Sequence, residues 1–180
     1  MTNAWPLTMW SDARQICAVL RWPRMLGDDE PPDRFFRDLR AQGRDSEATL
    51  FLGQALPRFE AVLWAAGAIT TSRTTVDAKA MAAVHGWLRE PSDRHRRIAG
   101  LCAQAIRGTS AARLCAQAVF VAGGSLMSPD KPAIAAPKDA TGRLAAAAVL
   151  AAAADSHIRS IVLARALDHG SLLAAGRAET

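Results

Sequence analysis

The chain has 180 residues, half of them hydrophobic, with 39 alanines, 5 tryptophans and no tyrosine. Alanine is the strongest intrinsic helix former, so this composition favours closely packed helices over a β-sandwich or barrel, whose strands need β-branched and aromatic side chains. The apolar fraction also excludes a disordered tail and a collagen-like repeat. The net charge of +5 is carried mostly by arginine, which indicates either an anionic partner or the amino-acid bias of a GC-rich genome.

The first part of the chain has helical spacing of apolar residues, interrupted by residues that break helices. The spacing predicts a helix over 10–22 that ends at Pro23, a loop over 27–33, and a short helix over 35–43. A further helix over 46–56 ends at Pro57, which is well placed to begin the next helix, over 57–69.

The remaining helices are expected over 74–88, 91–105, 110–122, 141–154 and 157–168. The helix over 91–105 carries a set of apolar residues at helical spacing: Ile98, Leu101, Cys102 and Ala105. We therefore predict an all-α single domain over residues 1–180, with seven or eight helices packed antiparallel through short connections. Residues 1–44 are the part that the pattern defines least, and 123–139 is a proline-containing loop.

A short sequence occurs twice in neighbouring helices. Leu101-Cys-Ala-Gln-Ala-Ile106 recurs as Leu114-Cys-Ala-Gln-Ala-Val119. The distance in sequence between the two copies, from residue 101 to residue 114, is shorter than the repeating unit of a solenoid. We therefore interpret the two copies as adjacent helices that use the same small-residue face.

Cysteine usage, the N-terminus and the absence of catalytic motifs limit the function. The 3 cysteines form no C-x-x-C pair, which predicts a reducing compartment and buried thiols rather than disulfides or a metal site. The N-terminus lacks the pattern of a signal peptide, and the longest uncharged apolar run, 144–154, is about half a membrane span. No metalloprotease, serine-hydrolase or phosphate-binding motif occurs in the sequence. We expect a cytoplasmic, non-catalytic protein without a cofactor and without membrane contact.

Two sets of residues are candidates for surface contacts. The densest basic cluster contains Arg94, Arg96 and Arg97, and it indicates either a phosphate-binding or acid-binding patch or, as we favour, a solvated helix face. Trp64 lies one residue off the buried stripe of its helix, and Trp5 lies outside any predicted helix. Exposed tryptophans are enriched at protein interfaces, so Trp5 and Trp64 are predicted interface residues.

The loop over 123–139 is the third candidate. Its first residues form either an anion-binding turn or, as we favour, a helix stop: Gly123, Gly124, Ser125 and Leu126. Pro129 and Pro132 have the P-x-x-P spacing of proline-rich ligands. Long loops are often functional, but Ile134 and Ala135–Ala136 indicate that this loop packs back on the helices. Both alternatives stay open.

The stretch from Trp87 to Ala154 contains Pro91, the Arg96–Arg97 pair and the Gly123-Gly-Ser-Leu126 segment followed by prolines. In these residues it resembles an uncharacterised, all-helical family of bacterial proteins, a domain of unknown function whose genes sometimes lie near type VI secretion genes. The sequence departs from that pattern at Val121, where an aromatic residue is expected. The resemblance implies no catalytic residues. More loosely, the chain also resembles helical immunity-type proteins.

These observations together predict a protein that acts through contacts with another protein, as an accessory or adaptor of a secretion system. One alternative is an immunity-like protein that binds and neutralises a toxin. A second alternative is a weak nucleic-acid-binding module that uses the basic segment from Arg89 to Arg107.

Overall fold

The computed structural model describes residues 4–72, 77–128 and 130–177, and in these ranges the chain forms nine α-helices and no strand. The helices are α1 (Ala13–Leu20), α2 (Pro32–Ala41), α3 (Asp45–Ala55), α4 (Arg58–Ser72), α5 (Ala78–Arg89), α6 (Asp93–Ala105), α7 (Ala111–Val121), α8 (Ala140–Ala154) and α9 (Arg159–Ala174). The predicted all-α fold is confirmed: each of the nine ranges expected from the spacing overlaps a helix, one more than the predicted total of seven or eight.

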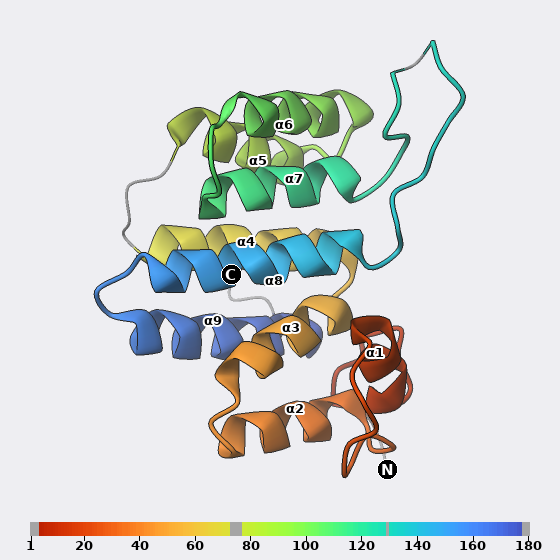
Figure 1. Ribbon diagram of the computed structural model, residues 1–180, viewed down its shortest axis with the longest axis vertical. Coiled ribbons are helices and arrows are strands. Elements are labelled where there is room, and N and C mark those ends of the chain that lie inside the picture. The colour runs from red at the N-terminus through yellow and green to blue at the C-terminus, as the bar shows by residue number, and fades with distance from the viewer. Residues whose placement is uncertain (1–3, 73–76, 129, 178–180) are drawn as a thin grey trace.

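The helices lie in successive layers (Figure 1). Helices α5, α6 and α7 form one end of the molecule, α4 and α8 lie side by side below them, and α3 and α9 follow. Helices α1 and α2 form the other end. Helix α8 contacts α3, α4, α7 and α9, so its alanine-rich sequence forms the centre of the core.

The small residues allow the helices of the core to approach closely. A methyl group added to Gly53 of α3 would lie only 2.6 Å from the carbonyl oxygen of Gly142 in α8. In the same way, Gly100 of α6 faces the ring of Phe120 in α7, where an added Cβ would lie 2.6 Å from Cδ2. The alanine and glycine content therefore sets the distances between helix axes.

Side chains at the helix starts explain where several helices begin. Asp12, Asp77, Ser92 and Ser110 each accept a hydrogen bond from a backbone N–H in the first turn of the helix that follows. The first helix, expected from residue 10, begins at Ala13 because Asp12 is its N-cap. Such caps satisfy backbone donors that the helix itself cannot.

The two tryptophans predicted to be exposed are buried, and that prediction is wrong. Trp64 is fully buried in α4, and its Nε1 donates a 2.7 Å hydrogen bond to the carbonyl oxygen of Ala166 in α9. Trp5 is also buried, with its ring 5.0 Å from that of Phe36. Both indoles therefore hold the core together rather than face solvent.

Candidate functional site at the base of the projecting loop

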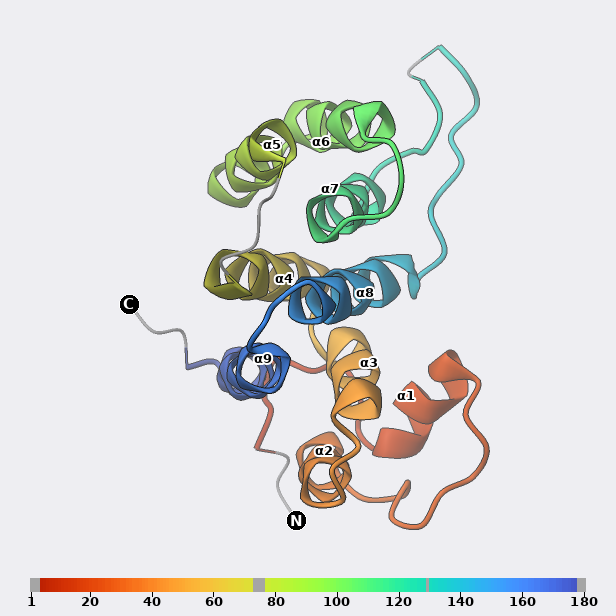
Figure 2. The ribbon, with the colours of Figure 1, turned by 60° about the vertical axis from the view of Figure 1, so that its left-hand side comes forward.

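Between α7 and α8 lies the segment 122–139, whose described residues, 122–128 and 130–139, leave the helical layers and extend beyond them (Figures 1 and 2). We call it the projecting loop. All its described residues from 128 to 135 are exposed, including Ile134, whose side chain is 53% exposed. The expectation that Ile134 and Ala135–Ala136 pack back on the helices is therefore wrong for Ile134 and Ala135, while Ala136 is half-buried.

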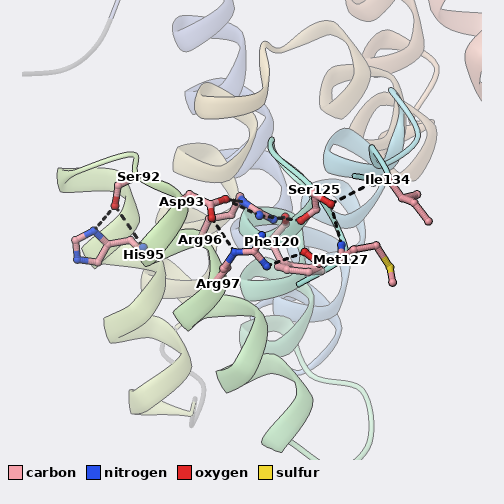
Figure 3. Close-up of polar contacts among 9 residues, drawn as sticks. All are labelled: Ser92, Asp93, His95, Arg96, Arg97, Phe120, Ser125, Met127 and Ile134. Atoms are coloured by element: carbon pink, nitrogen blue, oxygen red, sulfur yellow. Dashed lines mark hydrogen bonds and ion pairs between the residues drawn. The ribbon is translucent and has the colours of Figure 1, made fainter. Parts of the chain in front are cut away.

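The projecting loop is held at its base by Arg96 of α6 (Figure 3). Arg96 is only 3% exposed, and its Nη1 donates to the carbonyl oxygen of Phe120, the penultimate residue of α7, at 2.6 Å. Its Nη2 donates to the carbonyl oxygen of Ser125 at 2.9 Å. The guanidinium also lies 5.0 Å from the centre of the Phe120 ring, a cation–π distance. One buried side chain thus joins α6, the end of α7 and the start of the loop.

Asp93 and Arg97 complete this base. Oδ1 of Asp93 accepts hydrogen bonds from Nε and Nη2 of Arg96, at 2.9 and 2.6 Å, and Oδ2 accepts one from Nε of Arg97, at 2.7 Å. Hydrogen bonds from Arg97 and Arg96 lower the pKa of the Asp93 carboxyl. Nη1 of Arg97 then reaches the carbonyl oxygen of Met127 at 3.0 Å. The carboxylate orients both guanidiniums toward the loop and balances one of their charges.

Backbone pairing narrows the loop just above this base. Leu126 N–H donates to the carbonyl oxygen of Ile134 at 2.8 Å, and Ser125 and Ala135 form an isolated antiparallel bridge. The hydroxyl of Ser125 accepts hydrogen bonds from the N–H groups of Met127 and Ile134. The loop therefore consists of an anchored neck, 122–127 with 134–135, and an exposed tip between them.

Gly124 is required where the loop passes the arginine. It has φ of +62°, in the left-handed region, and a Cβ there would lie 2.9 Å from both Arg96 Nη2 and Asp93 Oδ1. The predicted helix stop at this position is confirmed, because α7 ends at Val121. The alternative, an anion-binding turn, is not what forms here: the carbonyl oxygens of Phe120 and Ser125 converge on a guanidinium.

The predicted basic cluster does not form one surface. Arg94 is exposed, Arg96 points inward, and Arg97 is half-buried and paired with Asp93. The interpretation of all three as a solvated helix face is therefore wrong for Arg96. Of the two loop prolines, Pro132 is exposed in the tip, and Pro129 lies outside the described residues.

Sequence reasoning did not place Asp93 or Phe120 among the candidate site residues. The spacing of Asp93 from Arg96 and Arg97 is that of ion pairs within one helix, and this was an available signal. The sequence did not indicate the role of Phe120, because the contact with Arg96 is made by the backbone carbonyl group of Phe120, which lies on a different helix. At the start of α6, Ser92 caps the helix: its Oγ accepts from His95 N–H and lies 3.0 Å from His95 Nδ1.

The larger surface grooves lie elsewhere. A groove of about 560 Å³ between α2 and α9 is lined by Arg37, Arg40 and Asp168, among others. Arg40 pairs with Asp168, and Arg37 pairs with Asp33. These cations are thus already paired with carboxylates of the chain. Among the described residues, no group of histidine, cysteine and acidic side chains is arranged to hold a metal ion. Within the same ranges, no helix is long and apolar enough to cross a membrane.

Fold and site together define a class: an all-helical single domain that presents one anchored loop. The chain belongs to a family of unknown function, DUF6931, whose model matches residues 35–174. The match confirms the resemblance to an uncharacterised domain family and extends it from 87–154 to helices α2 through α9. No curated protein and no solved structure matches the chain.

Proposed function

We propose that this protein is a non-catalytic, cytoplasmic binding protein that contacts another protein through the projecting loop. The observation that carries the proposal is the contrast between the neck and the tip of this loop. Buried Arg96 and its partners fix the neck, whereas the tip exposes Lys131 and Pro132, and the neck residue Ile134 beside it also exposes its side chain.

An anchored loop is well suited to binding. Ordering a flexible segment on association costs about 0.5–1.5 kcal/mol for each immobilised side chain, and preorganisation reduces that cost. The exposed isoleucine supplies apolar area, and the flanking prolines restrict the backbone. The resemblance described above extends this proposal to an accessory or adaptor role in a secretion system.

The alternative of nucleic-acid binding has less support. Phosphate binding needs accessible cations, and two arginines of the basic cluster, Arg96 and Arg97, are already bound to Asp93 and to loop carbonyl groups.

Site-specific photo-crosslinking in the native host tests the proposal. A photoreactive amino acid replaces Ala133 in the loop tip or, as the matched control, exposed Ser160 at the start of α9. We expect a discrete protein adduct from position 133 that is absent from position 160. Identical adducts from both positions, or none from position 133, would contradict the proposal. A toxin in the adduct would assign the immunity-like alternative, and a nucleic acid would replace the proposal with the second alternative.

A further inference from the structure

Helix α6 has an apolar stripe on its outer face. The helix packs against α5 and α7 and lies at the edge of the molecule (Figure 2). Along one line of its outer face lie Arg94, Ile98, Leu101 and Ala105, all exposed. Leu101 is 66% exposed and Ile98 is 38% exposed. The buried face of α6 consists instead of small residues and Arg96: Ala99, Gly100, Ala103 and Arg96. The larger apolar side chains of α6 thus face solvent.

The stripe has the spacing of a helix–helix seam. Positions 94, 98, 101 and 105 follow the alternating four-three spacing of the d and a positions of a heptad. Ile98 then occupies an a position and Leu101 a d position, the combination that pairs well with one other helix. The stripe extends over about three helical turns, which is enough for a short amphipathic helix to lie along it.

The repeated hexapeptide supports a helical occupant. In α7, the positions that correspond to Ile98, Leu101 and Ala105 are Ala111, Leu114 and Ala118. Ala111 and Ala118 are buried and Leu114 is half-buried, because α7 lies between α6 and α8. The positions that pack against neighbouring helices in α7 are therefore exposed in α6, which contacts α5 and α7 through its other face.

The charges around the stripe select the chemistry of the partner. Exposed Arg94 lies in the stripe and exposed Arg107 follows its end, whereas Arg97, which borders the stripe on the side of the projecting loop, is already paired with Asp93. A second copy of this chain would bring two such arginine sets together, and like charges in an interface oppose association. An acidic helix would instead complement them.

We propose that the outer face of α6 binds an amphipathic helix of a partner protein, with an Ile/Leu seam and acidic flanks. This inference rests on the proposed function, because it assumes that the protein acts through protein contacts. It adds a second surface beside the neck of the projecting loop, to which Arg97 is joined through Met127.

The test uses a synthetic three-heptad peptide with Ile at a, Leu at d and Glu at e and g, titrated calorimetrically and mapped by amide NMR shifts. We expect binding with shift changes along α6, and at least about tenfold weaker binding of a peptide with Lys in place of Glu. Leu101→Gln and Ile98→Gln should each weaken binding by about tenfold or more. The control Ile161→Gln, at an exposed isoleucine of α9, should leave it unchanged.

Three results would overturn the inference. The first is that the acidic peptide does not bind at about 1 mM, the upper end of measurable weak affinity. The second is that the Lys peptide binds with equal affinity, and the third is that the shift changes lie away from α6. A wild-type dimer that Leu101→Gln dissociates would show that a second copy covers this face instead. Because Leu101 is largely exposed, its variant should keep the wild-type circular dichroism and melting curve. A discrete adduct from position 133 together with failure of the peptide titration would leave the proposed function standing and remove only this inference.

Discussion

Replacement of Arg96 by alanine tests whether this side chain holds the projecting loop. The change leaves the carbonyl groups of Phe120 and Ser125 without the donors that they have in the wild type. An orphaned buried acceptor costs about 1–3 kcal/mol, so two partly buried acceptors give an expected loss of about 2–4 kcal/mol. The Asp93 carboxylate adds little, because its side chain is 57% exposed and water replaces the lost donors.

For a domain of this size, about 1 kcal/mol corresponds to about 2–4 °C in Tm, so we expect a decrease of about 4–16 °C. Urea denaturation gives the free energy of unfolding, and hydrogen exchange gives the local effect. The amides of Leu126, Met127 and Ile134 should exchange faster, since their hydrogen bonds form the neck. Arg94→Ala is the matched control: this exposed arginine of the same helix turn should change stability by less than about 0.5 kcal/mol. The reasoning is refuted if Arg96→Ala changes neither quantity more than Arg94→Ala does.

Three further predictions concern acid stability, helix contact and thiol reactivity. Because the pKa of Asp93 is lowered in the folded protein, its ionised form stabilises the fold above the unfolded pKa, and this contribution is lost as pH falls through the folded pKa. The variant Asp93→Asn should therefore be less stable than wild type at pH 7. In urea titrations, this difference in stability should shrink below about pH 4. Gly53→Ala should lower the free energy of unfolding by about 1–3 kcal/mol or more, because the new methyl group meets the carbonyl oxygen of Gly142. The control Gly123→Ala, which has open space around it, should be tolerated. Equal melting temperatures of the two variants would contradict this prediction. Burial raises the pKa of the Cys115 thiol to about 12, so a thiol reagent at pH 8 should modify it only after unfolding, as mass spectrometry of the labelled peptides can show.

Helical periodicity predicted most of the fold, because most helices bury an apolar stripe and end at proline or glycine. The prediction of buried and exposed residues failed for a helix that has other helices on several sides. Helix α4 contacts α5, α7, α8 and α9, so a residue off its main stripe, such as Trp64, is buried as well. Trp5 is buried through contacts with distant parts of the chain, which spacing along the sequence does not encode.

The site was predicted in its parts but not in its arrangement. The loop and the glycines at its start were recognised from sequence, and so were Arg96 and Arg97 as a cluster. The contact between Arg96 and the loop was not predicted, because Arg96 donates to backbone carbonyl groups, which every residue has. The close packing of α6 against Phe120 requires Gly100 at the contact, so Arg96 and the small residues of α6 face inward. The larger apolar residues of α6 therefore face outward.

The anchored neck also separates the tip of the projecting loop from the stability of the domain. Once Arg96 and the antiparallel pairing fix the ends, lengthening the tip changes only the entropy of closing a loop, which rises by about 0.6 kcal/mol for each doubling of length. Tip residues can therefore be exchanged, inserted or deleted while the helical layers keep their packing. Relatives that share the neck are free to diversify the tip, and a foreign peptide grafted between residues 128 and 133 should be displayed on an unchanged scaffold.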